Sequence, residues 1–212
     1  MSQSYFYEVE RGHGLAHDPF KAIVAPRPIG WISTRGTNGV VNLAPYSFFN
    51  ALSGEPPIVA FCSTGWKDSI TNIAATREFV ANMAVRPLCA AVNLTSGDFP
   101  PEVDEMAIAG LTAAPCRLVG APRVAESPAA LECRLLQTQQ LADLEGRQLD
   151  AYLVIGQVVG VHIDPGFIRD GMFDTAAAAP ILRAGYRGDY FGLGEKFEMV
   201  RPSAASLGNF LK

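Results

Sequence analysis

A segment rich in hydroxyl groups lies where an expected strand runs into an expected helix: Cys62-Ser-Thr-Gly-Trp-Lys-Asp-Ser-Ile-Thr71. A phosphate group needs clustered donors, and the hydroxyls of Ser63, Thr64 and Ser69, the ammonium of Lys67 and the free amides of a helix start would supply them. An ordinary polar turn before a capped helix would use the same residues. We assign Asp68 to such a cap, because a bare carboxylate would repel a phosphate.

A second candidate follows a strand and alternates polar side chains with a proline and aromatic rings: Asn42-Leu-Ala-Pro-Tyr-Ser-Phe-Phe-Asn50. A flat heteroaromatic ligand with a hydrogen-bonding edge needs exposed amides, a few hydroxyls and aromatic walls. Ala44 precedes Pro45, which favours an extended backbone for such contacts. Tyr46, Phe48 and Phe49 could instead be core residues, and for at least one phenylalanine this is the simpler interpretation.

A third candidate is the strand Arg27-Pro-Ile-Gly-Trp-Ile-Ser-Thr34. Because alternate residues of a strand share a face, one face carries Ile29, Trp31 and Ser33, and the other carries Gly30, Ile32 and Thr34. Either face could serve a ligand, although a tryptophan in a strand is more often part of the core.

Other common catalytic arrangements are missing from the sequence. The three histidines, His13, His17 and His162, support neither a Ser-His-Asp set nor a metal site, so we expect no metal and disfavour hydrolysis. His162 ends an apolar strand just before the turn Asp164-Pro-Gly166, where it could bond to the backbone or, at a barrel rim, contact a nicotinamide or a substrate. It is the only catalytic candidate, and the catalytic residue otherwise stays unassigned.

No dinucleotide fold is expected either. The sequence has no Gly-x-Gly-x-x-Gly and no Gly-x-x-x-x-Gly-Lys segment, so a nicotinamide nucleotide would lack a domain of its own and would have to dock over another cofactor.

The distribution of turn residues predicts many short strands and few helices, since the 20 glycines and 15 prolines are spread along the chain. Asn38-Gly39 predicts a tight hairpin between two of the strands. We expect helices at 69–77, behind a cap at Asp68, and at 101–109, closed by Gly110. Expected strands are 29–34, 40–43, 58–63, 78–85, 131–136 and 152–163.

These elements predict a mainly β protein: a closed or partly closed, Greek-key-like antiparallel barrel with a few peripheral helices. At 212 residues the chain suits a single domain, 1–212, with its core at about 20–200. The net charge of -4 disfavours a nucleic-acid partner.

We expect a cytoplasmic protein with no membrane partner. No basic run leads into an apolar segment near the start, and the longest uncharged apolar stretch, 151–163, is shorter than the roughly 20 residues of a membrane span. The four cysteines have apolar neighbours and no Cys-x-x-Cys spacing, so we expect buried free thiols and neither disulfides nor zinc: Cys62, Cys89, Cys116 and Cys133.

An ordered series of motifs resembles the flavin reductase-like FMN-binding proteins over roughly residues 20 to 200. Each motif is unspecific alone, but their order and separation are characteristic. They are Pro26–Thr34, Asn42–Phe49, Pro56-Pro57, Lys67–Asn72, Glu78–Asn82, Ala109-Gly-Leu111, Ser127-Pro128, Leu131-Glu-Cys133, Ile181–Tyr186, Tyr190 and Gly192–Glu195.

The resemblance implies a split β-barrel that binds FMN, usually as a homodimer with the flavin near the subunit interface. It assigns Ser63, Lys67 and Ser69 to the phosphate, although many relatives have threonine at the position of Ser69. It also implies that Arg183 and Tyr190 approach the site in a way that the sequence does not fix. The ribityl chain and ring would be lined by Asn42, Ala44, Pro45, Tyr46 and Ser47, with Trp31, Ser33 and Thr34 completing the pocket.

The activity implied is that of a flavin reductase in which NADH or NADPH transfers hydride to FMN, with a separate monooxygenase as a candidate user of the reduced flavin. One alternative is an FMN protein for electron transfer or storage without nicotinamide-dependent activity. Another is a pyridoxal phosphate or haem relative on a similar barrel. The sequence does not distinguish NADH from NADPH, or a bound FMN from one that passes through as substrate.

Overall fold

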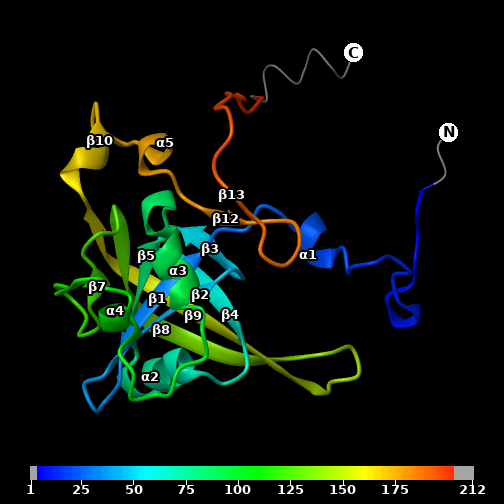
Figure 1. Ribbon diagram of the computed structural model, residues 1–212, viewed down its shortest axis with the longest axis horizontal. Coiled ribbons are helices and arrows are strands. Elements are labelled where there is room, and N and C mark those ends of the chain that lie inside the picture. Colours follow the sequence, from blue (N-terminus) through cyan, green and yellow to red (C-terminus); the bar gives the residue numbers. More distant parts are fainter. Residues whose placement is uncertain (1–3, 203–212) are drawn as a thin grey trace.

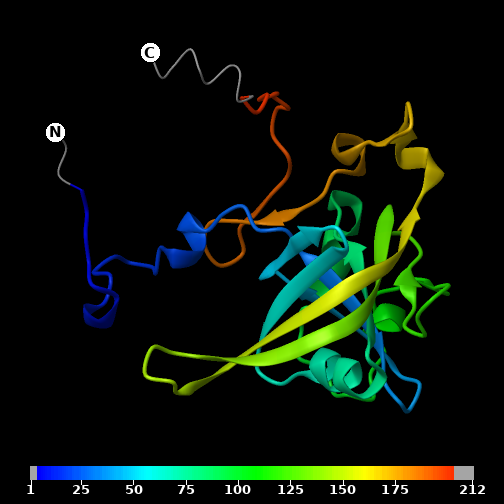
Figure 2. The same cartoon turned by 180° about the vertical axis from the view of Figure 1, so that it is seen from behind.

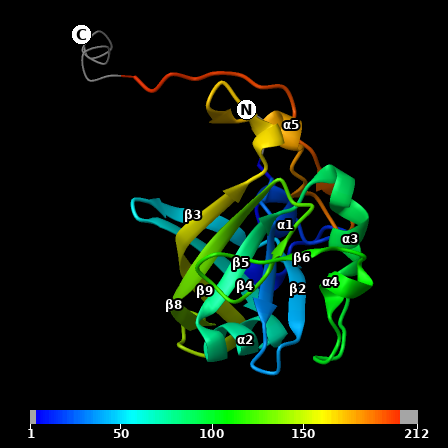
Figure 3. The ribbon, with the colours of Figure 1, turned by 90° about the vertical axis from the view of Figure 1, so that its left-hand side faces the viewer.

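The protein is a curled antiparallel sheet with small helices at its ends, seen in a computed structural model that describes residues 4–202 (Figures 1 and 3). Seven strands of the described residues form the sheet in the order β2-β1-β5-β8-β9-β4-β3. This confirms the mainly β, antiparallel barrel that was predicted. The strands are β1 (Gly30–Arg35), β2 (Val41–Tyr46), β3 (Phe49–Gly54), β4 (Pro57–Thr64), β5 (Glu78–Met83), β8 (Ala129–Ala142) and β9 (Gln148–Ile163).

The barrel is open between β2 and β3, which are the two edge strands of the sheet although they follow each other in sequence. Only Ser47 and Phe48 separate them. The smaller strands form three two-stranded pairs outside the barrel: β6 (Ala113–Ala114) with β7 (Arg123–Val124), β10 (Ile168–Arg169) with β11 (Met172–Phe173), and β12 (Leu182–Arg183) with β13 (Tyr190–Phe191).

Helix α2 (Asp68–Thr76) covers one end of the barrel (Figure 3). It inserts Ile70 and Ile73 into a core that includes Phe61 and Phe79, all four fully buried. The remaining helices are shorter: α1 (Phe20–Ile23), α3 (Cys89–Leu94), α4 (Glu105–Ile108), α5 (Thr175–Ala178) and the 3-10 turns η1 (Val9–Arg11), η2 (Arg86–Leu88) and η3 (Pro165–Phe167). Of these, α3 and α4 pack against β2.

The predicted hairpin is β1–β2, but its turn differs from the prediction. Gly39 has a positive φ of 86°, whereas Asn38 does not, and the loop is closed by bonds from Gly36 to Val40 and from Gly39 to Gly36. Strand β2 also runs on to Tyr46, so the segment 42–46 lies within a strand and does not follow one. Pairing with β1 as far as Gly30 holds Ala44 and Pro45 in the extended form.

Both predicted helices exist with different starts. Lys67 occupies the N-cap of α2 with no side-chain cap bond, so the cap predicted at Asp68 is wrong, and Asp68 is the first helical residue. The second helix, α4, begins at Glu105 and not at 101, because the carboxylate of Asp104 accepts a bond from the amide of Ala107 and caps it there. Gly110 follows with a positive φ of 69°, as expected.

Strands β8 and β9 form a long hairpin that projects beyond the barrel (Figure 2). They contain the predicted strands 131–136 and 152–163 and extend both. Strand β3, which was not predicted, pairs with β4 at the sheet edge.

All four cysteines are free thiols, but only Cys133 is buried; Cys62 and Cys116 are partly buried and Cys89 is exposed. Cys89 is the first residue of the short helix α3, which buries only Val92, so apolar neighbours in sequence do not bury it. Among the described residues, no helix has the length and apolar character needed to cross a membrane.

Candidate functional site

A cavity of about 410 Å³ lies where β2, the end of β4 and the start of α2 meet. Of the predicted cofactor residues, those from β2, the β2–β3 junction, β4 and α2 line it: Asn42, Ala44, Pro45, Tyr46, Ser47, Ser63, Lys67 and Ser69. The segments 42–47 and 63–69, which the sequence analysis treated as separate candidates, therefore form one site. The fold of the open barrel brings the end of β2 beside the end of β4.

The structure does not bring Trp31, Ser33 and Thr34 into the cavity lining. All three are fully buried, and each bonds to protein. The Trp31 indole donates to the hydroxyl of Thr95 over 2.9 Å, the Ser33 hydroxyl donates to the carbonyl of Pro122 over 2.6 Å, and Thr34 accepts from Asn72 over 3.0 Å. Strand β1 pairs with β2 and β5 along its two edges, and its two faces are buried in separate core clusters, with Ile32 in one and Trp31 in the other.

Hydroxyl groups concentrate at the α2 end of the cavity. The Ser69 hydroxyl accepts a bond of 2.8 Å from the Asn42 amide, which leaves its proton free to be donated elsewhere. The Ser63 hydroxyl donates to the carbonyl of Gly65 over 2.9 Å. The first amides of α2 have no partner within the helix, so this end of the cavity is rich in donors.

The Tyr46 hydroxyl is buried in the same place with no hydrogen-bond partner among the described residues. Burial raises the pKa of Tyr46, and the nearby hydroxyls of Ser69 and Ser63 partly oppose that rise, so the phenol stays protonated and is a donor. Its ring packs on Phe61 at 4.6 Å between centroids, which prevents the hydroxyl from turning to solvent. A buried donor of this kind is normally satisfied, so the geometry fits a ligand that accepts a bond there.

Charges around the donors are mixed. Lys67 pairs with Asp98 at 3.1 Å, but its side chain is 53% exposed and that of Asp98 is 93% exposed, so the pair is weak and the ammonium can turn to a ligand. Glu105 is buried and lines the cavity. Burial raises the pKa of Glu105 despite a bond from the Leu43 amide, and the nearby Asp68 and Asp104 raise it further, which favours the neutral acid.

One wall of the cavity was missed in the sequence. It consists of Thr95–Phe99, after α3, together with Glu105 on α4. Lys21 of α1 also lines the cavity and was not predicted, whereas Phe48 belongs to the second candidate segment. The wall is held by tertiary contacts, the Trp31–Thr95 bond and the bond from the Leu43 amide to Glu105, which leave no local pattern in the sequence.

Comparison with known proteins agrees with this architecture. Residues 24–177 match the model of the flavin reductase like domain. The chain belongs to the flavin reductase-like family. An uncharacterized protein of Deinococcus radiodurans is 37% identical over 213 residues, which cover 95% of this chain and 91% of that protein.

Two solved structures have folds similar to that of this flavin reductase-like chain. Nitrilotriacetate monooxygenase component B of Bacillus cereus superimposes with a TM-score of 0.82 at 28% identity, covering 93% of this chain and all of that one (100%). A split-barrel protein of Shewanella frigidimarina gives a TM-score of 0.76 at 23% identity, covering 87% of this chain and 90% of that one. The barrel opening between β2 and β3 is therefore that of a split barrel.

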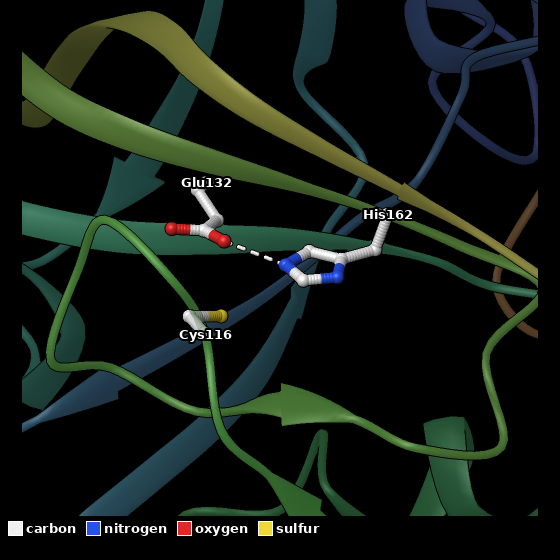
Figure 4. A group of neighbouring side chains, drawn as sticks. All are labelled: Cys116, Glu132 and His162. Carbon is white, nitrogen blue, oxygen red and sulfur yellow. Dashed lines mark hydrogen bonds and ion pairs between the residues drawn. The ribbon is translucent and has the colours of Figure 1, made fainter.

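His162 lies outside the cavity of this flavin reductase-like protein. Its Nε2 is 2.5 Å from Oε1 of Glu132, so it bonds to a carboxylate and not to the backbone (Figure 4). Glu132, 1% exposed, also accepts bonds from the amides of Arg117, Leu118 and Val119. Burial alone would raise the pKa of Glu132, but these amides and His162 outweigh it and lower the pKa. The pair anchors the segment 117–119 to the sheet.

The Cys116 thiol completes a group in which one ligand atom each of Cys116, Glu132 and His162 lie within 4.8 Å of one another (Figure 4). Burial, and then the charge of Glu132, raise the pKa of Cys116 to about 11, so the thiol is protonated at neutral pH. Both carboxylate oxygens already accept hydrogen bonds. The geometry is that of a structural anchor.

Arg183 and Tyr190 also lie outside the cavity lining. They face each other across the pair β12–β13, with the Arg183 guanidinium 4.6 Å from the centroid of the Tyr190 ring. The backbone of Arg183 bonds to that of Arg27 in both directions at 2.8 and 2.9 Å, and Arg27 likewise does not line the cavity.

Proposed function

We propose that this flavin reductase-like protein binds FMN in the cavity, with the phosphate held at the start of α2. The observation that carries the proposal is the buried Tyr46 hydroxyl, which lies near the Ser69 and Ser63 hydroxyls and the helix amides but makes no hydrogen bond of acceptable geometry within residues 4–202. A phosphate accepts several such bonds at once, and a helix N-terminus favours its charge. Family membership supports the identity of the ligand.

Different residues of the cavity would then contact different parts of FMN. Lys67 and Ser69 bind the phosphate by charge and by hydrogen bond, and Tyr46 donates to it or to the adjoining ribityl chain. The extended segment Ala44–Ser47 lines the rest of the ligand, and Phe48 forms an apolar wall. When bound, FMN supplies a ring that accepts hydride, while the protein supplies position and restricts access of water.

We further propose that the protein is an NAD(P)H-dependent flavin reductase that functions as a homodimer and passes reduced flavin to a monooxygenase. Family membership supports reduction of a flavin, and the 28% identical relative is named as a component of a monooxygenase. The cavity is lined by no residue that must act as an acid or a base, and hydride transfer to a flavin requires none.

The test is to purify the protein, measure its flavin content, and then assay oxidation of NADH and of NADPH with added FMN. Oxidation of either nucleotide at a rate proportional to protein supports the reductase. Tight FMN binding without oxidation of either nucleotide would favour an electron-transfer or storage protein. Failure to bind FMN would refute the whole proposal, and the colour of the protein would separate flavin from haem or pyridoxal phosphate.

A further inference from the structure

Two basic side chains from separate segments lie over the Phe48 ring at the cavity, and the strand that carries a third, Arg183, is bonded to one of them. The Lys21 ammonium is 5.8 Å from the centroid of the Phe48 ring, and the Arg27 guanidinium is 5.9 Å from the same centroid. Arg183 pairs with Arg27 through the backbone, and its charge, after burial itself, lowers the pKa of Arg27. The cluster therefore combines α1, the approach to β1 and β12 in one place.

No carboxylate neutralises this cluster. Among residues 4–202, no acidic side chain lies within ion-pair distance of Lys21, Arg27 or Arg183. The neighbouring carboxylates of Asp18 and Asp189 accept bonds from backbone amides, of Phe20 and Tyr186.

Arg27 makes this arrangement unusual, because its side chain is only 7% exposed. One guanidinium nitrogen donates to the carbonyls of Lys21 and Val24, but Nε is buried with no partner among the described residues. A buried charge is normally paired, since its desolvation is costly. Nε is enclosed by protein, so it is the charge of Arg27, without a counter-charge among residues 4–202, that favours an anion on the side of the cluster that faces the cavity.

The identity of the anion follows from the position of the cluster. Phe48 and Lys21 both line the cavity, so an anion held here lies next to whatever binds in it. The chain has no dinucleotide fold, so a nicotinamide nucleotide must find its phosphate contacts on the barrel itself. Arginine recognises phosphate by paired hydrogen bonds, and a flexible lysine adds charge.

We propose that Lys21, Arg27 and Arg183 form the binding site for the phosphate groups of the nicotinamide nucleotide. The proposal rests on the proposed reductase function, and it adds where the hydride donor is held. Phe48 positions two of the three cations by contact with its ring.

The experiment uses ligands that carry the phosphates but not the nicotinamide. The full chain, loaded with FMN so that Lys67 is engaged, is titrated with ADP-ribose and with inorganic pyrophosphate by calorimetry. Lys21→Gln and Arg183→Gln should each weaken both ligands by about tenfold, the value of one charge-assisted contact. Arg117→Gln, a change at an exposed arginine on the segment held by Glu132, should leave both affinities unchanged.

Arg27 is tested by Arg27→Lys, with thermal unfolding to confirm that the variant folds. Lysine keeps the charge but has a single nitrogen, so it cannot hold the two carbonyls with one nitrogen and offer a phosphate the paired bonds of a planar guanidinium, and binding of both ligands should weaken. Equal affinity of the wild type and of the double variant K21Q/R183Q for ADP-ribose would overturn the proposal. So would a loss of FMN affinity with unchanged ADP-ribose affinity, because the cluster would then serve the flavin.

Neither ligand can be oxidised, so the outcome does not depend on turnover. ADP-ribose binding that is lost in the variants, in a protein that oxidises neither NADH nor NADPH, would refute the reductase activity and leave the anion site in place. If the chain takes up no FMN, the same titrations on a Lys67→Ala background decide the proposal.

Discussion

The side-chain amide of Asn42 on β2 donates a hydrogen bond of 2.8 Å to the hydroxyl of Ser69 in the first turn of α2. Both side chains are buried and both line the cavity. Since the Ser69 oxygen accepts from Asn42, its own proton can be donated to a ligand. The bond thus joins strand to helix and orients one of the donors that the FMN phosphate would use.

Asn42→Ala should weaken FMN binding by about 1 kcal/mol, roughly fivefold, because Ser69 loses the partner that orients it. Asn72→Ala is the matched control. Asn72, also on α2, donates to Thr34 over 3.0 Å outside the cavity. Both variants should lose similar stability in urea unfolding, but only Asn42→Ala should change the dissociation constant in a fluorescence titration. Equal FMN affinities would remove this bond from the site.

Tyr46→Phe should have opposite effects on stability and on binding. In the protein without flavin the substitution removes a buried hydroxyl that has no hydrogen-bond partner in the described part of the chain, so the free energy of unfolding should rise by about 1 kcal/mol. The contact of the ring with Phe61 is kept. FMN affinity should fall, because the ligand loses a donor. Calorimetric unfolding with and without FMN measures both, and a variant that binds FMN as tightly as the wild type would contradict this role.

Lys67→Ala should weaken FMN binding by about 1.5 to 3 kcal/mol through loss of a charge-assisted contact. Riboflavin, which lacks the phosphate, should bind the variant and the wild type equally. Asp98→Ala is the control, because it removes the partner of Lys67 and leaves the ammonium in place. It should preserve or increase FMN affinity. A parallel loss for both flavins would show that Lys67 acts on the fold and not on the phosphate.

Local sequence patterns predicted the elements of this protein better than they predicted the faces of those elements. Runs of β-branched and aromatic residues correctly predicted the central strands. Strand β3 was missed because most residues of Phe49–Gly54 are exposed, polar or small. The alternation of side chains along β1 did not show which of its two faces, if either, would contact a ligand. Both faces are buried in the folded barrel, which decided against Trp31, Ser33 and Thr34. That burial comes from tertiary partners such as Thr95 and Pro122, distant in sequence.

Some residues of the site could be predicted from local sequence patterns, and others could not. The segments 42–47 and 63–69 carry their chemistry within short stretches, and the structure brings them together. Glu105 and Thr95 join the cavity only because α3 and α4 pack against β2, at separations of 62 and 64 residues from their bonding partners Leu43 and Trp31. The partner of His162 was likewise unpredictable, since Glu132 lies on the neighbouring strand at a distance of 30 residues.

Glu132→Gln should destabilise the protein by about 3 kcal/mol at neutral pH, because an amide cannot accept from three backbone amides and His162 as a carboxylate does. The folded pKa of Glu132 is lowered, so its contribution is fully present above its unfolded pKa of about 4.3 and is lost as pH falls through the folded value. The stabilities of wild type and variant should therefore converge in acid. Glu102→Gln, at an exposed carboxylate, should cost little at any pH. A constant gap in urea unfolding between pH 7 and pH 3 would contradict this account.

Glu105→Gln should change the pH dependence of FMN binding and leave the fold intact, since glutamine still accepts from the Leu43 amide. The folded pKa of Glu105 is raised by burial, so the contribution of its neutral form to stability is complete below the ordinary pKa and is lost as pH rises through the folded value. Over the same range an ionised Glu105 repels the phosphate. Wild-type affinity for FMN should therefore fall relative to the variant as pH rises, by about tenfold at the plateau.

The second ionisation of the FMN phosphate, near a pKa of about 6, is common to both proteins and cancels in the ratio of their dissociation constants. Riboflavin is the control ligand, and its ratio should stay constant with pH because it carries no phosphate to repel. A ratio for FMN that is independent of pH would mean that the phosphate lies too far from Glu105 to sense its charge. The acid would then serve only to hold α4 against β2 through the amide of Leu43.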